Sequence, residues 1–381
     1  MTVILTADHP VGATFAAIAG GPTPELLLSL DVLRAQYETL SATLPGTTLY
    51  FAVKANPHPD VLAALRGVGC SFSIEGPAEV ASARAAGALP AQLLSANPIQ
   101  SRVAIRAEYA AGVRLFVADS LDEAAKLADD APGSSVLGRL AMTSDGNGLP
   151  LGGKFGADTA ALVSLLDRLP AMGLRPAGVG FHVGHPHAEP GRWRAPIRAA
   201  ADIFARLRAL GHRPWLLDLG GGFPPHGVRE GAPLASYGVE IRRALSESFG
   251  HFPPRTIAQP GRALVGDAGT LVTTVIGVAQ RGGERWVYLD AGVFNGLTEA
   301  IGDAFHDRLS TTAAPSASAP AVLAGPTSDA ADVLSHRVML PSALQAGDRV
   351  FIRTAGAYTT AHATSYNAMD PIPTRIVDQL P

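Results

Sequence analysis

The sequence has little of three things, and each shortage excludes a class of protein. It contains one cysteine, Cys70, among 381 residues, so no disulfide can form within the chain and thiolates alone cannot build a structural zinc site. Charged residues make up 17% of the chain, and the formal net charge is −3 without a basic tail. The electrostatic footprint of a nucleic-acid-binding protein is therefore missing. Long apolar runs are also missing, so no membrane span is expected.

These shortages, together with the start of the sequence, predict a cytoplasmic protein. The first twenty residues carry Asp8, His9 and Pro10 and have no basic region ahead of an apolar stretch. A secretory signal is therefore not expected. A chain of this length can bury a large core and has room for two domains.

What is present, from Thr48 to about Gly266, is one recurring unit: a short apolar run, a turn and an amphipathic helix. Eight apolar runs that alternate with helices predict an α/β fold, a (β/α)8 TIM-type barrel. The expected strands are Leu49–Val53, Ser71–Ile74, Gln92–Ala96, Leu115–Ala118, Ser135–Met142, Gly178–His182, Leu216–Leu219 and Thr256–Ala258. The expected helices are Pro59–Gly67, Pro77–Ala86, Ser101–Ala111, Leu121–Ala128, Asp158–Leu169, Pro196–Leu210 and Tyr237–Ser248, with Glu25–Leu44 as a helical approach to the first strand.

The character of the sequence changes after Arg262. Runs rich in Val, Thr and aromatic residues follow without long helices between them, which predicts an antiparallel β domain. Leu309–Pro320 is small, polar and interrupted by proline, and it is expected to be a flexible loop. We therefore predict a barrel domain over residues 25–265, and a β domain built from residues 1–24 and 266–381. The expected β runs are Ala263–Gln280, Arg285–Leu289, Ala321–Leu323 and Arg349–Ala355.

A single lysine follows the first expected barrel strand, in the stretch Thr48–Pro57 (TLYFAVKANP). Pro57 ends strand pairing soon after Lys54. Lys54 has apolar neighbours and no acidic residue nearby in sequence, which favours a neutral amine. A neutral amine is the nucleophile that Schiff-base chemistry requires. The alternative is a strand-end lysine whose ammonium simply reaches water.

Two glycine-containing motifs at expected strand ends are typical of phosphate sites. Asp218–Pro224 (DLGGGFP) carries three consecutive glycines whose N–H groups are open to a ligand. It is not followed by GKS or GKT, so it is not a Walker A loop. Gln259–Arg262 (QPGR) ends the last barrel strand. Arg262 either holds a phosphate there or pairs with a surface acid.

A histidine stands at another expected strand end, in Phe181–Gly184 (FHVG). His182 could be a metal ligand, a base, a flat surface for a ring, or a hydrogen-bonded core residue. No HExxH spacing or flanking carboxylate supports a metal site, so no metal is expected.

Taken together, the motifs resemble one family. YFAVKANP, the ANP at Ala96–Pro98, KFG, FHVG, LDLGGGFP, PGR, AGPTSDAADVL and GAYTT follow the order and rough spacing of the fold-type III pyridoxal-phosphate amino-acid decarboxylases. The resemblance spans essentially the whole chain and is closest to short bacterial ornithine/lysine decarboxylases. It implies an alanine racemase-like barrel, the cofactor pyridoxal 5′-phosphate, and decarboxylation of ornithine or lysine to a diamine and CO2.

The resemblance also implies a role for each matching residue. Lys54 would form the Schiff base with the cofactor, His182 would stack on its ring, and Asp329 would accept the distal amine of the substrate. Such enzymes are head-to-tail homodimers with shared active sites, so Ser328 and Asp329 would serve Lys54 of the partner subunit. The phosphate would be held by Gly220, Gly221, Gly222, Gly261, Arg262 and Tyr358, and Arg139 and Glu79 would support the cofactor site.

Four positions depart from the family pattern. Gln259 stands where the family has the glutamate that keeps the pyridine nitrogen protonated. Ser328 replaces the cysteine that protonates Cα, and a hydroxyl is a far weaker acid than a thiol. Ser73 replaces an aspartate, and His185 replaces a phosphate-binding serine. These departures keep four alternatives open: a decarboxylase of a modified amino acid or amino-acid conjugate, racemisation, a decarboxylation that ends in an aldehyde, and a catalytically weakened regulatory homologue.

Overall fold

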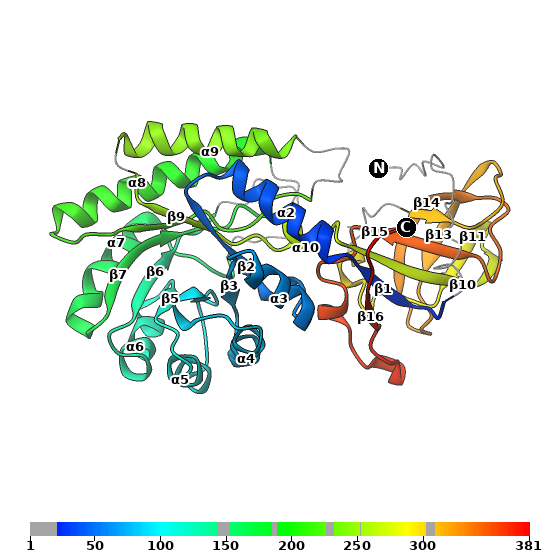
Figure 1. Cartoon of the computed structure of the whole chain (residues 1–381), viewed down its shortest axis with the longest axis horizontal. Coiled ribbons are helices and arrows are strands. Elements are labelled where there is room, and N and C mark those ends of the chain that lie inside the picture. The colour runs from blue at the N-terminus through cyan, green and yellow to red at the C-terminus, as the bar shows by residue number, and fades with distance from the viewer. Residues whose placement is uncertain (1–20, 143–152, 185–188, 226–231, 252, 302–308) are drawn as a thin grey trace. The chain divides into compact units, whose positions relative to one another are not determined.

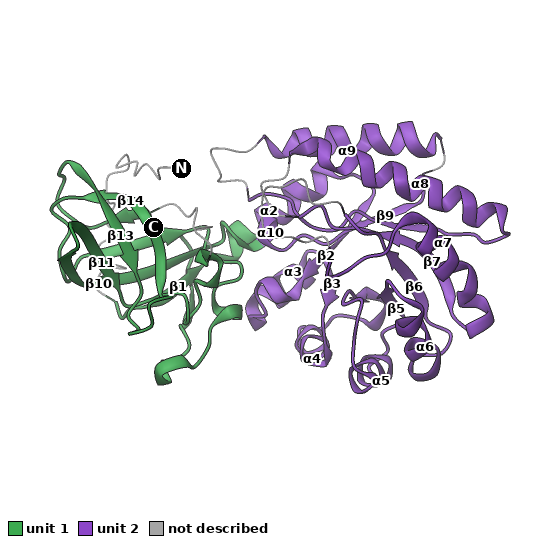
Figure 2. Ribbon diagram, turned by 180° about the vertical axis from the view of Figure 1, so that it is seen from behind, with its two compact units in different colours: residues 1–33, 265–381 green, residues 34–264 purple. Residues whose placement is uncertain are grey.

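The computed structural model describes residues 21–142, 153–184, 189–225, 232–251, 253–301 and 309–381. The chain divides into two compact units (Figure 2). Residues 34–264 form what we call the barrel unit, and residues 1–33 with 265–381 form the β unit.

Within the described residues, eight parallel strands close into a barrel, as the alternating pattern predicted. Each strand pairs with the next along the chain, and the last closes on the first through Thr256 and Thr47. The strands are β2 (Thr47–Ala52), β3 (Ser71–Ile74), β4 (Leu93–Ser95), β5 (Leu115–Ala118), β6 (Ser135–Arg139), β7 (Arg175–Gly180), β8 (Leu216–Asp218) and β9 (Arg255–Ala258).

Helices lie around the outside of these strands (Figure 1). Side-chain caps fix where several begin: Ser101, Ser120 and Asp158 each accept the N–H of the residue three positions later, which satisfies an otherwise unpaired donor. No helix in the described ranges is long and apolar enough to cross a membrane. The helices are α3 (Pro59–Gly67), α4 (Pro77–Ala85), α5 (Arg102–Ala110), α6 (Leu121–Asp130), α7 (Thr159–Arg168), α8 (Arg194–Ala209), α9 (Leu234–Phe249) and α10 (Arg262–Val265).

The barrel strands are buried on both faces. One set of strand side chains packs into a single interior cluster. Their neighbours in sequence, such as Phe51 and Phe116, point to the opposite face and are also fully buried. This explains why the strands read as continuous apolar runs. The interior cluster consists of Tyr50, Leu94, Ala96, Val117, Leu137, Ala177, Leu216 and Ile257.

The β unit is a mixed sheet. Its central strands follow the order β12-β15-β10-β11-β13-β14, with β1 on β10 and β16 on β1. The prediction of a purely antiparallel domain is wrong for two pairs, since β11 with β13 and β1 with β16 are parallel. The strands are β1 (Glu25–Leu28), β10 (Gly269–Arg281), β11 (Glu284–Leu289), β12 (Leu309–Thr311), β13 (Ser318–Ala324), β14 (Val333–Pro341), β15 (Arg349–Arg353) and β16 (Thr374–Ile376).

Two local predictions are wrong because strand pairing overrides local composition. The expected loop Leu309–Pro320 contains all of β12 and the start of β13; Leu309 is buried and lies opposite Ile352 of β15. The expected helix Glu25–Leu44 begins instead as strand β1, paired with β10, and only Leu30–Thr43 is helical (α2). The strand β1 therefore belongs to the β unit.

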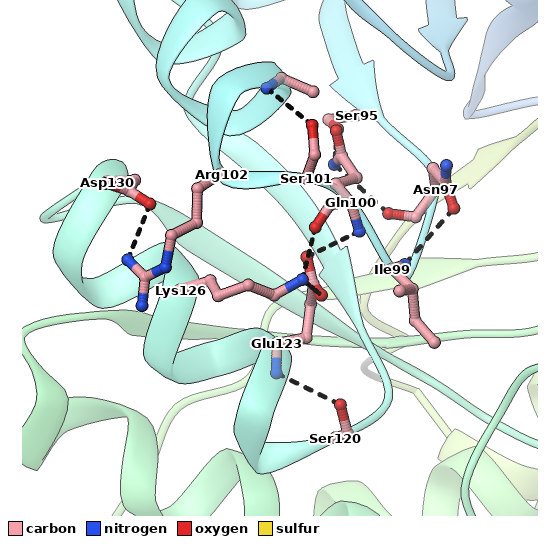
Figure 3. Close-up of polar contacts among 11 residues, drawn as sticks. Ser95, Asn97, Ile99, Gln100, Ser101, Arg102, Ser120, Glu123, Lys126 and Asp130 are labelled. Atoms are coloured by element: carbon pink, nitrogen blue, oxygen red, sulfur yellow. Dashed lines mark hydrogen bonds and ion pairs between the residues drawn. The ribbon is translucent and has the colours of Figure 1, made fainter.

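A polar network holds the loop that follows β4 (Figure 3). Gln100, 7% exposed, donates its backbone N–H to Glu123 Oε1 at 3.1 Å, and its carbonyl accepts from Lys126 Nζ. Lys126 also pairs with Glu123 at 2.5 Å. The network ties the second ANP motif to α6.

Glu108 of α5 lies behind this loop and is fully buried. The amide nitrogen of Gln100 faces its Oε1 at 3.0 Å, and the amide oxygen of Gln100 accepts from Ser95 Oγ at 2.7 Å. Burial raises the pKa of Glu108 to about 7 despite the hydrogen bonds from Ser95 and Gln100. The folded protein therefore favours the protonated form of Glu108.

Glu108→Gln is expected to flatten the dependence of stability on pH. An acid whose pKa is raised by folding stabilises below its unfolded pKa, about 4.3, and that contribution of roughly 3 kcal/mol is lost as pH rises through the folded pKa. Urea unfolding from about pH 4.5 to pH 8 measures it. The free energy of unfolding of the variant, relative to wild type, should rise over this window. A constant difference would show that Glu108 does not titrate in this way.

Candidate active site

The carboxyl ends of the barrel strands bring most of the expected site residues to one rim. Lys54 follows β2 in the short helix η1 (Val53–Ala55), Arg139 ends β6, and His182 follows β7. The glycines follow β8, and Gln259 follows β9. Because parallel barrel strands end on the same face, these side chains share the face on which barrel enzymes carry their active sites.

Lys54 is not in the apolar setting that the sequence led us to expect. Its side chain is 51% exposed, and Nζ lies 2.8 Å from Oε1 of Glu75, the residue that follows β3. An opposite charge at this distance favours the ammonium form. No acid is near Lys54 in sequence, but the pairing of β2 with β3 brings Glu75 next to it in space.

Glu79 holds the turn that carries Glu75. It lies in the first turn of α4, and its Oε2 accepts the backbone N–H of Glu75 at 2.8 Å. Burial raises the pKa of Glu79 to about 7, and the charge of Glu75 adds to this. The sequence placed Glu79 at the cofactor site, and in the structure it positions Glu75.

His182 presents a neutral ring. Burial lowers its pKa to about 3, and the cations Arg139 and Lys54 act in the same direction. Nδ1 accepts the Gly184 N–H at 3.0 Å, so the proton of the neutral ring belongs on Nε2. A neutral, flat ring suits stacking rather than charge pairing.

Arg139 faces acids from several strands. Its pKa is lowered by burial, and the charges of Asp218, Glu75 and Asp119 oppose that shift. Asp119, which follows β5, in turn accepts the Gly156 N–H at 2.7 Å. Arg139 therefore supplies positive charge to a rim that is otherwise rich in carboxylates.

The glycine turn lies close to two other strand ends. A Cβ on Gly220 would lie 2.0 Å from the Phe181 carbonyl oxygen, and one on Gly221 would lie 2.7 Å from the Gln259 carbonyl oxygen and 3.1 Å from His182 Nε2. Gly220 also has a φ of +67°. Only glycine fits such close approaches.

Gln259 lies between two polar partners. Ser73 Oγ donates to its Oε1 at 2.7 Å, and its Nε2 donates to Asp218 Oδ2. Asp218 also accepts the Gly220 N–H at 2.8 Å, and burial raises its pKa to about 6. The amide of Gln259 is thereby fixed, and the two family departures at Ser73 and Gln259 form one hydrogen-bonded unit.

Three expected residues lie in the β unit. Tyr358 has a φ of +59°, a backbone conformation that non-glycine residues adopt rarely and that is often found at functional sites. Ser328 is exposed, and Asp329 Oδ2 accepts from the Tyr366 hydroxyl at 3.3 Å. Gly261 lies between β9 and α10, Arg262 is the first residue of α10, and His185 lies outside the described residues.

The loop that presents Ser328 and Asp329 has a rigid base. The buried carboxylate of Asp332 accepts from the Thr327 N–H at 2.9 Å and from the Val293 N–H at 2.7 Å. A Cβ on Gly325 would lie 2.2 Å from Asp332 Oδ1. This explains the glycine and the second aspartate in the motif GPTSDAAD.

Sequence reasoning missed Glu75 and the part played by Asp218. The signal for Asp218 was present, since it opens the DLGGGFP motif directly after a strand. Glu75 also follows a predicted strand. Active-site residues of these barrels lie at the carboxyl ends of the strands, so this rule would have predicted Glu75 as a site residue.

Comparison with known proteins agrees with this geometry. Residues 30–266 match the family model for the pyridoxal-dependent decarboxylase, pyridoxal binding domain. The chain belongs to the pyridoxal-dependent decarboxylase family. The lysine/ornithine decarboxylase of Selenomonas ruminantium is 31% identical over 362 residues, 94% of this chain and 91% of that protein. The ornithine decarboxylase of Schizosaccharomyces pombe is 31% identical over 370 residues, 92% of this chain and 83% of that protein.

A solved structure extends this similarity to the fold. The lysine/ornithine decarboxylase of Vibrio vulnificus, solved with cadaverine, superposes with a TM-score of 0.87 at 31% identity, covering 99% of this chain and all of that one. Pyridoxal 5′-phosphate is the cofactor of this family, and the rim fits it. Lys54 offers the amine, His182 a flat neutral surface, and the close-packed glycine turn an approach for a phosphate.

Gly221→Ala is expected to weaken binding of pyridoxal 5′-phosphate at least about tenfold, because the added methyl meets backbone rather than a flexible side chain. Fluorescence titration of the cofactor-free protein measures the affinity. Gly191→Ala, where nothing lies within 4 Å of the place that a Cβ would occupy, is the matched control and should bind like wild type. Equal affinity of both variants would remove the glycine turn from the cofactor site.

Gln259→Glu is expected to destabilise the protein at high pH. It would place a second carboxylate beside buried Asp218, and two such groups in contact cannot both ionise without a cost, here about 2 kcal/mol. Urea unfolding of the cofactor-free variant should show a larger loss at about pH 8 than at about pH 5. Adding Asp218→Asn should remove the pH dependence. A loss independent of pH would contradict the proposed contact of charges.

Proposed function

We propose that this protein decarboxylates a basic amino acid, ornithine or lysine, to the diamine and CO2, using pyridoxal 5′-phosphate. The observation that carries the proposal is the convergence of Lys54, His182 and the glycine turn on one rim of the barrel. The relatives named as lysine/ornithine decarboxylases, and the neighbouring structure with cadaverine, support the substrate class.

The bound cofactor supplies an electron sink for the electrons of the bond that breaks. The chain's own residues do the rest. Lys54 would supply the amine that holds the cofactor, and the neutral ring of His182 would offer it a flat surface without adding charge. Gln259, fixed by Ser73 and Asp218, would present an amide to the cofactor where the family resemblance implies a carboxylate. An uncharged amide would stabilise positive charge on the cofactor less than a carboxylate would.

Asp329 is proposed to recognise the distal amine of the substrate. It lies at the tip of a loop whose base is fixed by Asp332, and a carboxylate is the natural partner of a cationic group. Ser328 beside it is exposed, and its hydroxyl is a weak acid in the position where the family carries a thiol. Return of the proton to Cα is therefore the step expected to be slow.

We further propose that the protein works as a head-to-tail homodimer, in which Ser328 and Asp329 serve Lys54 of the partner subunit. The exposure of Ser328 in the single chain supports this arrangement. A cytoplasmic location stays a prediction from the sequence.

Purified protein loaded with pyridoxal 5′-phosphate should release putrescine from ornithine or cadaverine from lysine, and Lys54→Ala should release neither. Asp329→Asn should raise KM for these two substrates at least about tenfold, because the charged partner of the distal amine is lost. Mass spectrometry of a panel that also holds arginine and diaminopimelate reads the products. Cofactor binding without turnover of the panel would favour a modified amino acid or conjugate as substrate.

Mixing Lys54→Ala protein with Asp329→Ala protein, which at a substrate concentration below KM keeps at most about a tenth of the wild-type activity, tests the shared site. Random exchange of subunits in a two-fold dimer restores one intact site in mixed dimers, so activity should recover to about a quarter of wild type. No recovery after mixing, with exchange shown by native mass spectrometry, would place both residues in the same subunit's site.

A further inference from the structure

Glu75 is an acid at the rim for which the resemblance implies no role. It approaches the one lysine on which cofactor chemistry depends: Oε1 lies 2.8 Å from Lys54 Nζ. Its own position is fixed, since Glu79 Oε2 accepts its backbone N–H at 2.8 Å from the first turn of α4. The Glu75 side chain is 28% exposed, so the pair is partly shielded from water.

The charges around this pair come from several elements. Arg139 at the end of β6 lies within the electrostatic reach of Glu75, as do Glu79 in α4 and Glu108 in α5. Lys54 in turn acts on His182 after β7 and on Glu79. Burial raises the pKa of Glu79 and Glu108 to about 7, so each is only partly ionised at neutral pH and is a weak counter-ion for Lys54. Glu75 contacts the Lys54 ammonium directly.

Attachment of the cofactor changes what Glu75 can bind. The Lys54 nitrogen joins the aldehyde carbon, the aldehyde oxygen leaves as water, and the ammonium must first give a proton to solvent. An ammonium carries three N–H donors, whereas the linked nitrogen carries at most one. A carboxylate at this position therefore stabilises the free ammonium more than the linked nitrogen.

We propose that Glu75 is a positioning residue that holds Lys54 as a free ammonium and so favours the state in which a substrate amine has displaced the lysine. The inference rests on the proposed function, because it requires Lys54 to be the lysine that carries the cofactor. In this role Glu75 weakens the resting attachment of the cofactor and eases its transfer to the substrate.

The experiment compares the equilibrium for covalent attachment of pyridoxal 5′-phosphate in wild type, Glu75→Gln and Glu75→Asp, at one fixed pH and without substrate. Visible absorbance follows the attached form, and borohydride reduction followed by peptide mass spectrometry shows that it lies on Lys54. Loss of this partly exposed ion pair should strengthen attachment about fivefold in Glu75→Gln. Glu75→Asp, which keeps the charge, should lie nearer to wild type.

Glu240→Gln is the matched control, because it removes ion pairs to Arg194 and Arg243 on the barrel unit without touching Lys54. It should attach the cofactor as wild type does. In steady state, Glu75→Gln should raise KM for the amino acid more than it lowers kcat, since displacement of the lysine becomes less favourable.

The outcomes separate the two proposals. If wild type does not attach the cofactor at Lys54, the proposed function fails. If wild type attaches it and Glu75→Gln attaches it equally or more weakly, the role of Glu75 fails while the proposed function stands.

Discussion

Closure of the parallel barrel is the constraint on which the site depends. Eight short strands are long enough to bury one interior cluster, and they all end at the same rim. Residues far apart in the sequence of the barrel unit, such as Ala52 and Pro260, become neighbours only because β9 closes on β2: the Ala52 N–H donates to the Pro260 carbonyl at 3.0 Å. Burial of the apolar side chains inside the barrel stabilises the fold and offsets the free energy required to bring polar groups together at this rim.

Burial decides the charge state of most rim residues. It raises the pKa of Asp218 and Glu79 and lowers that of His182 to about 3. Burial also strengthens the electrostatic interactions among the charged groups of the rim, such as those of Arg139 with Asp218 and Glu75. Lys54 and Glu75 form a partly exposed ion pair at this rim, and their pairing sets the balance between a free and a linked lysine. At position 259, an uncharged amide lies beside the buried carboxylate of Asp218, so no second acid adds to the charge there.

The sequence carried enough information for the barrel, the family and most of the rim residues. Strands buried on both faces read as short apolar runs, and helices as amphipathic periods, so their alternation predicted the topology. Strand pairs between distant segments could not be predicted in the same way. Glu25–Leu28 has helix-compatible composition and becomes a strand because β10 pairs with it. Leu309 and Ser318 similarly join strands only because β15 and β14 lie beside them.

The same distinction, between local sequence and pairing of distant segments, applies to the site residues. Lys54, His182, Gly221 and Arg262 could be predicted because each belongs to a short motif at a strand end. The partner of Lys54 could not be predicted from local sequence, because Glu75 is brought there by the pairing of β2 with β3. In the sequence, Ser73 and Gln259 are two separate departures from the family pattern, each replacing an acid. In the structure they form one unit, because Ser73 Oγ donates to Gln259 Oε1.

The most direct test of the proposed chemistry is to run the reaction with ornithine or lysine in heavy water and to weigh the product by mass spectrometry. We predict a diamine that carries one deuterium on carbon, since CO2 leaves from Cα and a solvent-derived proton replaces it there. An aldehyde in place of the diamine would show that protonation occurs on the cofactor and that Ser328 has changed the outcome. A protein that holds pyridoxal 5′-phosphate on Lys54 and yields neither product would contradict decarboxylation of a basic amino acid.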